Sequence, residues 1–142
     1  MAKKSNYGWV FVGDTPAGRT QKPTESVKRK TDISMQPFIE ELKEKHLQPI
    51  PEPHDRNHLI NVYGKWNRNF YYIYQTYKSP PEGYIKDKFD EGLVRMRYVG
   101  DEKFDLAYFR HTGEWVELPS SSKLTITEAI EAIKTDPWFQ VF

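Results

Sequence analysis

The chain of 142 residues has 37% hydrophobic and 15% aromatic residues, a formal net charge of +1 and no cysteine. This length fits one domain with an appended segment. The lack of cysteine excludes disulfides and thiolate metal sites and favours a cytoplasmic location. No stretch is long and apolar enough for a membrane span or a secretory signal, so we expect no membrane partner.

The charges are unevenly distributed. Residues 1–33 carry seven basic and three acidic residues, residues 56–97 carry eight and four, and residues 100–142 carry four and eight. A basic middle beside an acidic end can guide an anionic partner to one face. The basic excess is nevertheless modest for a dedicated nucleic-acid domain, so we favour a protein partner and keep nucleic acid as an alternative.

Residues 1–33 are predicted to form a flexible basic tail, and residues 34–142 a single α+β domain. The tail is polar, contains two prolines and lacks apolar periodicity. It also holds a short apolar patch, residues 7–12, which can add a strand to its own sheet or to the edge of another molecule. We favour pairing with its own sheet, and pairing with another copy would make a homo-oligomer.

A first helix is predicted over residues 34–47. Its apolar face is formed by Phe38, Ile39, Leu42 and His46. Asp32 or Ser34 can cap the helix, and Pro37 is tolerated in its first turn. The three prolines of residues 48–53 then predict an extended linker.

A four- to five-stranded antiparallel sheet is predicted next. Seven aromatic residues fall within the nineteen positions 59–77, a composition typical of strands rather than helices. Turn residues recur at short intervals afterwards, which indicates a β-meander. The predicted strands are residues 58–66, 70–77, 93–99, 104–110 and 114–118.

A second helix is predicted to follow Thr125, which forms a Thr-x-x-Glu capping box with Glu128. Its apolar stripe consists of Ile126, Ala129, Ile130 and Ile133, and we expect these isoleucines to meet aromatic residues of one sheet face. Asp136 and Pro137 end the helix. We expect the remaining aromatic and apolar residues, Trp138, Phe139, Val141 and Phe142, to pack on the domain.

Part of this C-terminal pattern resembles an uncharacterised family of small bacterial domains of unknown function. The resemblance lies in Leu106–Arg110, Gly113–Trp115, Thr125–Lys134 and Asp136–Phe139. It covers the last third of the chain and leaves the tail and the first helix outside. It implies an antiparallel sheet packed by one helix, and it carries no catalytic residues to transfer.

Basic and aromatic residues on the predicted sheet form the leading candidate site. Arg95 and Arg97 share one face of their strand, and a tyrosine face of the preceding strand can lie beside them. Together with basic residues near the first hairpin turn, they form the predicted partner-binding set: Lys65, Arg68, Tyr71, Tyr72, Arg95 and Arg97. Such a surface suits stacking and phosphate contacts. The alternative is a sheet face stabilised by its own arginine–tyrosine and arginine–carboxylate pairs.

Two arrangements suggest metal-dependent chemistry instead. His54, Asp55 and His58 have the side chains that a zinc or manganese site uses, but such a site also needs a ligand from elsewhere, such as His46, Asp105 or His111. A nuclease-like arrangement can be built from Asp105, Glu114, Glu117 and Lys123, provided that a bulge turns the two glutamates to one face. Both patterns are more typical of solvated surface.

The sequence therefore favours a non-enzymatic cytoplasmic binding module, for which we expect no cofactor. Its partner is a protein or a nucleic acid, which an aromatic and basic sheet surface contacts. A metal-dependent hydrolase or nuclease that uses His54, Asp55 and His58 or Asp105 is the alternative. A small homo-oligomer is a third interpretation.

Overall fold

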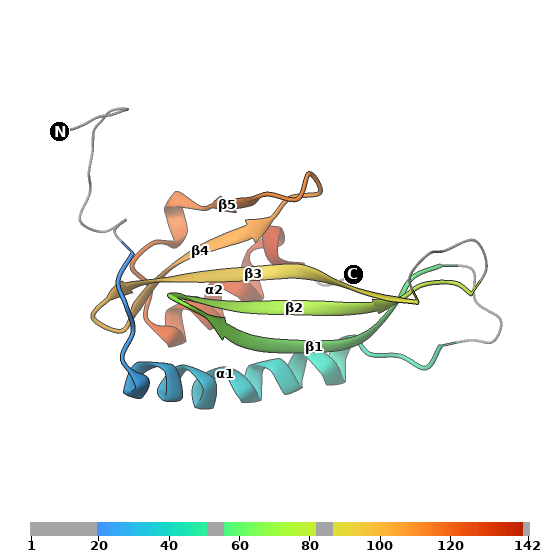
Figure 1. Ribbon diagram of the computed structural model, residues 1–142, viewed down its shortest axis with the longest axis horizontal. Coiled ribbons are helices and arrows are strands. Elements are labelled where there is room, and N and C mark those ends of the chain that lie inside the picture. Colours follow the sequence, from blue (N-terminus) through green and yellow to red (C-terminus); the bar gives the residue numbers. More distant parts are fainter. Residues whose placement is uncertain (1–19, 51–55, 82–86, 141–142) are drawn as a thin grey trace.

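A computed structural model describes residues 20–50, 56–81 and 87–140 of the chain (Figure 1). Its helices and strands, in chain order, are α1 (Glu25–His46), β1 (His58–Asn67), β2 (Phe70–Lys78), β3 (Lys88–Gly100), β4 (Lys103–Phe109), β5 (Trp115–Glu117) and α2 (Ile126–Thr135). Two short 3-10 helices, η2 (Pro119–Ser121) and η3 (Pro137–Phe139), lie on either side of α2 in the chain. The predicted α+β fold is confirmed.

The five strands form one antiparallel sheet in the order β1-β2-β3-β4-β5, which confirms the meander. The strand predicted at residues 93–99 is longer, because β3 begins at Lys88 and pairs with the end of β2. Gly92 does not break this strand as predicted. It lies at an irregularity of the β2–β3 pairing, which leaves Leu93 unpaired with β2.

The first helix begins at Glu25 rather than at Ser34, so the prediction of its start was wrong. Thr24 caps it, because the Thr24 hydroxyl accepts a hydrogen bond from the Val27 amide at 3.1 Å. Thr31 is fully buried, and its hydroxyl satisfies its own hydrogen bonding by donating to the Val27 carbonyl at 2.8 Å. Thr31 thus extends the buried face of α1 into a segment whose sequence is mostly polar. Pro37, predicted in the first turn, lies in the interior of the helix.

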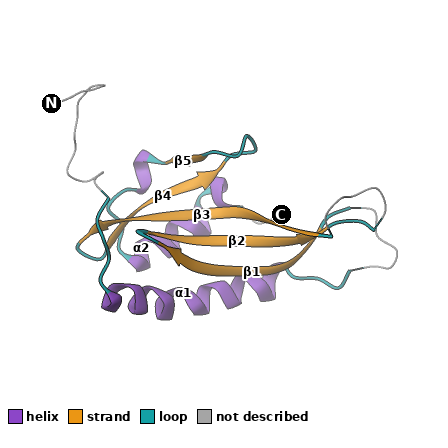
Figure 2. Cartoon of the chain, viewed as in Figure 1, coloured by secondary structure: helices purple, strands orange, loops and turns teal. Residues whose placement is uncertain are grey.

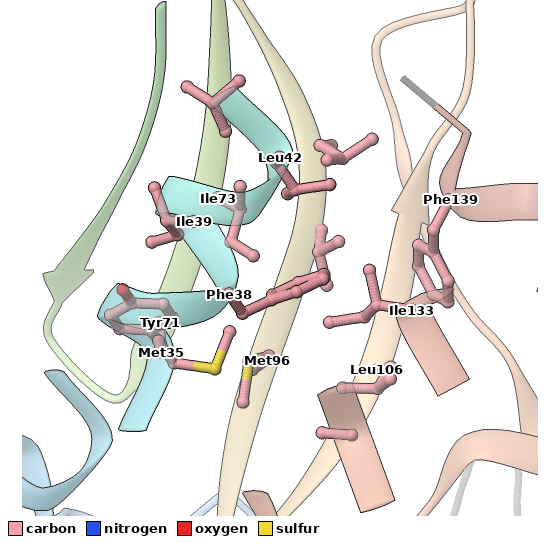
Figure 3. Close-up of a cluster of buried hydrophobic side chains, with 14 of the residues drawn as sticks. Met35, Phe38, Ile39, Leu42, Tyr71, Ile73, Met96, Leu106, Ile133 and Phe139 are labelled. Carbon is pink, nitrogen blue, oxygen red and sulfur yellow. The ribbon is translucent and has the colours of Figure 1, made fainter. Parts of the chain in front are cut away.

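Both helices pack on the same face of the sheet. α1 lies along β1, and α2 contacts α1 and β4 (Figure 2). Thr125 and Glu128 form the predicted capping box at the start of α2, with both hydrogen bonds present. Figure 3 shows side chains from these helices, among them Phe38 and Ile133, clustered with residues of the sheet. The labelled core residues are Met35, Phe38, Ile39, Leu42, Tyr71, Ile73, Met96, Leu106, Ile133 and Phe139.

The residues after α2 meet the sheet only in part. Phe139 is buried as predicted, whereas Trp138 is 58% exposed and its ring stacks on Tyr108. The other two apolar residues of this end, Val141 and Phe142, lie outside the described residues, as does the patch at residues 7–12. None of the helices described is long and apolar enough to cross a membrane.

Candidate functional site

Within the described residues, no helix covers the second face of the sheet, which we call the outer face. Strand alternation places on it every side chain that points away from α1 and α2. Its main side chains are Tyr63, Lys65, Phe70, Tyr72, Tyr74, Arg95, Arg97, Asp105, Phe109, Trp115 and Glu117. Six of these eleven side chains are aromatic, so this face has an unusual composition for a surface exposed to water.

The aromatic rings of the outer face form a continuous row. Tyr63 stacks on Tyr74 with ring centroids 5.6 Å apart, and Tyr74 stacks on Tyr72 at 5.5 Å. Phe70 and Trp115 extend the row from Tyr72, at 6.0 and 5.6 Å. Each of these rings is half-buried, because its neighbours shield its faces while part of it reaches solvent.

Trp115 lies across β3 at Gly92. A Cβ atom at Gly92 would lie 2.5 Å from Trp115 Cη2, so only glycine leaves room for the indole there. The ring also packs edge-on against Phe109, with centroids 5.0 Å apart. The glycine that interrupts the regular β2–β3 pairing therefore also determines where the largest ring of the outer face lies.

Arg95 is inserted among these rings. Its guanidinium lies 4.9 Å from the Phe70 ring centroid and 5.9 Å from that of Trp115, and its Nη2 lies 3.6 Å from a Glu117 oxygen. Its Nε atom is buried and has no hydrogen-bond partner among the residues that the structure describes. Arg95 thus binds neighbouring rings and one carboxylate instead of extending into solvent.

Arg97 is held by two carboxylates. Its guanidinium forms a two-pronged ion pair with Glu117, and its Nη2 lies 3.0 Å from Asp105 Oδ2. The other Asp105 oxygen accepts a hydrogen bond from the Lys123 amide at 2.7 Å. Burial raises the pKa of Asp105, although this amide and Arg97 oppose the rise. Hydrogen bonding to Glu117 raises the pKa of Arg97.

A hydrogen-bonded group joins the aromatic row at Tyr63. Asp90 accepts hydrogen bonds from the hydroxyls of Tyr63 at 2.8 Å and Thr76 at 2.7 Å. Burial, followed by this bond, raises the pKa of Tyr63 to about 12. The pKa of Tyr74 is raised as well, again mainly by burial.

The predicted partner-binding residues do not all lie on one surface. Lys65 and Tyr72 are on the outer face, where Lys65 Nζ lies 5.6 Å from the Tyr74 ring centroid, and Arg68 is exposed in the β1–β2 turn. Tyr71 does not belong to this set, because it is only 2% exposed and points into the core beside Gly64. Strand alternation separates it from Tyr72.

The structure describes only part of the residues predicted to bind a metal ion. His54 and Asp55 lie outside the described residues, and His58 begins β1, half-buried. Asp105 is 6% exposed and occupied by Arg97 and the Lys123 amide, so it is not an open ligand. Among residues 20–50, 56–81 and 87–140, no three histidine or carboxylate side chains are grouped to hold a metal ion.

Sequence reasoning missed several residues of the outer face. Phe70 and Tyr74 share a strand face with Tyr72, so their even spacing could have revealed them. Trp115 had no such signal, and Glu117 was considered only as a metal ligand, because the positions of both relative to Tyr72 and Arg97 depend on strands far apart in the chain.

The fold and its uncovered aromatic face define a class of small α+β domain, a five-stranded meander with two helices on one face. The family described as Domain of unknown function (DUF3024) matches residues 23–141. The chain belongs to this family, and the match includes α1 and every strand, not only the last third of the chain. No curated protein and no solved structure matches the chain.

Proposed function

We propose that this protein is a non-enzymatic cytoplasmic binding module whose outer face docks a protein partner. The observation that carries the proposal is the row of five half-buried rings, Tyr63, Tyr74, Tyr72, Phe70 and Trp115, on a face that no described helix covers. Rings of this kind provide large contact areas that lose little side-chain entropy when a partner binds. The cytoplasmic location rests on the absence of cysteine.

The charges of this face favour protein over nucleic acid. Arg97 is neutralised by Asp105 and Glu117, and Glu117 also lies close to Arg95. A phosphate backbone that approached Arg95 or Arg97 would meet these carboxylates, whereas nucleic-acid binding depends on uncompensated cations. Lys65 and Arg68, at the β1–β2 end, are the remaining cations of the predicted set. A matching partner offers apolar side chains to the rings and a carboxylate to this end.

The first test uses a photo-crosslinking amino acid in cells of the source organism. Placed at Tyr74, it should give a discrete protein adduct. The control position is Ile33, a large side chain on α1 that is 67% exposed. Adducts of equal yield at both positions, or no adduct at Tyr74, would overturn the proposal.

The second test uses the purified partner. Tyr74→Ser should weaken binding about tenfold, because truncation of an aromatic contact at an interface centre costs about 1–2 kcal/mol. Ile33→Ser removes an exposed apolar side chain from the opposite layer and should leave the affinity unchanged. Melting curves of both variants separate loss of binding from loss of folding. Equal affinities would contradict the proposal.

Nucleic acid and self-association are distinguished by two further measurements. Binding of labelled single-stranded DNA or RNA is measured at low and at high salt. Binding at low salt that is lost at high salt would show that the partner is a nucleic acid and not a protein. A solution mass of twice the chain, reduced by Tyr74→Ser, would identify the partner as a second copy. The hydrolase that uses His54, Asp55 and His58 or Asp105 stays a hypothesis that no observation on the described residues favours.

A further inference from the structure

A cavity of about 550 Å³ lies at the opposite end of β3 from the β3–β4 turn. β4 ends at Phe109, whereas β3 continues to Lys88, so the residues 88–93 of β3 have no β4 partner. Side chains of β2, of the β4–β5 turn and of η3 surround this cavity. The lining residues that matter here are Gln75, Glu91, Tyr108, Arg110, His111 and Trp138. The volume is in the range of small-molecule sites.

An aromatic plate forms one wall of the cavity. The rings of Tyr108 and Trp138 are stacked with centroids 4.5 Å apart and planes inclined by 24°. Trp138 is 58% exposed, so one ring face is covered by Tyr108 while much of the indole stays accessible. Such a plate favours a flat ligand that can continue the stack.

Gln75 supplies a buried hydrogen-bonding group to the same cavity. The residue is only 3% exposed, and its Oε1 accepts a hydrogen bond from the Tyr77 hydroxyl at 3.0 Å. No hydrogen bond to its Nε2 occurs within the described part of the chain. Gln75 Nε2 is not one of the fully buried, unpaired side-chain atoms of the described residues, so it reaches the cavity and can donate to an acceptor on a ligand.

The charged residues of the cavity are of both signs. Arg110 and His111 lie on the β4–β5 turn and are exposed, and no carboxylate of the described residues pairs with either. Glu91 lies on β3 directly opposite Gln75 of β2. The cavity therefore offers the Arg110 guanidinium and the His111 imidazole to an anion on one side, and a donor and an acceptor to a polar ring edge on the other.

We propose that this cavity binds a nucleotide whose base carries an amino group. The base stacks on Trp138, a ring nitrogen accepts from Gln75, and the exocyclic amine donates to Glu91. The phosphate lies against Arg110 and His111. A planar ring, a donor–acceptor edge and an anionic group are combined in this class of ligand. The cavity shares Phe109 with the outer face but none of the five rings of the aromatic row, and the inference does not depend on the proposed partner.

Calorimetric titration of the full chain with adenosine monophosphate tests the proposal, with the indole N–H resonance of Trp138 followed by NMR. Binding should shift this resonance, and inosine monophosphate, which lacks the amine, should bind several-fold more weakly. Ribose 5-phosphate should leave the resonance unshifted. Equal binding of the two nucleotides would overturn the assignment of an amino-bearing base.

Two exposed positions provide variants that should fold. Arg110→Ala and Trp138→Ala should each weaken binding of adenosine monophosphate about tenfold, through loss of a charge-assisted hydrogen bond and of stacking. Arg29→Ala, an exposed arginine on α1, is the matched control and should bind as the unaltered chain does. Absence of binding at millimolar nucleotide, or binding that neither cavity variant weakens, would overturn the proposal.

Discussion

Replacement of Arg97 by methionine should destabilise the fold strongly, because it leaves a buried carboxylate without its cation. The side chains of Arg97 and Asp105 are 11% and 7% exposed, and their contact is 3.0 Å. In R97M, Asp105 keeps only the hydrogen bond from the Lys123 amide. Methionine preserves most of the side-chain volume, so the loss of stability reports the removal of the positive charge and not the formation of a cavity.

The expected cost is about 3 kcal/mol of unfolding free energy, the lower end of what removal of one member of a buried pair costs. The lower end applies because Glu117, the second partner of Arg97, is 37% exposed and can be hydrated after the change. For a domain of this size the loss corresponds to a decrease in melting temperature of roughly 10–15 °C.

The cost should also depend on pH. Burial already raises the pKa of Asp105, and the loss of Arg97 raises it further. Below the pKa of an unfolded aspartate the carboxyl is neutral in both states, so R97M should lose little stability there. As pH rises through the folded-state pKa, the buried charge forms and the penalty reaches its full value.

Urea unfolding at acidic and neutral pH measures both quantities. Arg29→Met, on the exposed face of α1, is the control for the loss of an arginine. Asp105→Asn in the R97M background should restore most of the stability, since an amide oxygen can still accept from the Lys123 amide. A neutral-pH cost below about 1 kcal/mol, typical of a surface pair, would refute the reasoning, as would a cost independent of pH.

Two further results are expected. Gly64→Ala should destabilise by about 1–3 kcal/mol in chemical denaturation, because the new Cβ would overlap the Tyr71 hydroxyl in the core; a change within error would contradict this packing. The pKa of Tyr63 is about 12 in the folded protein and 10 in the unfolded chain. The stability that the protonated Tyr63 hydroxyl contributes is therefore fully present below pH 10 and is lost as pH rises from 10 towards 12. Tyr63→Phe and Asp90→Asn should each reduce this alkaline slope in a series of urea unfolding curves, and an unchanged slope in both would refute the assignment.

The sequence by itself determined the elements whose signals are local. The capping box at Thr125 forms as written, because its two hydrogen bonds join residues three positions apart. The short turns fix antiparallel neighbours, so the meander follows from their spacing. Alternation on β3 correctly placed Arg95 and Arg97 on one face, and Met96 between them is buried on the other.

The limits of α1 and β3 were not predictable in the same way. Thr31 reads as a polar residue, and only its hydrogen bond to the preceding turn allows it to be buried against the sheet. Gly92 reads as the end of a loop, yet pairing with β2 continues past it to Lys88. In both places a long-range contact overrides the local preference.

Only the tertiary structure decided what the surface residues do. Asp105 and Glu117 neutralise Arg97 from positions eight and twenty residues away, so a predicted phosphate contact is an internal ion pair. Trp115 occupies the space above Gly92. Trp138 stacks on Tyr108 at the cavity that the unequal lengths of β3 and β4 create. The physical reason is the same in each case: side-chain periodicity is a property of one strand, whereas charge compensation and ring contacts depend on which strands become neighbours.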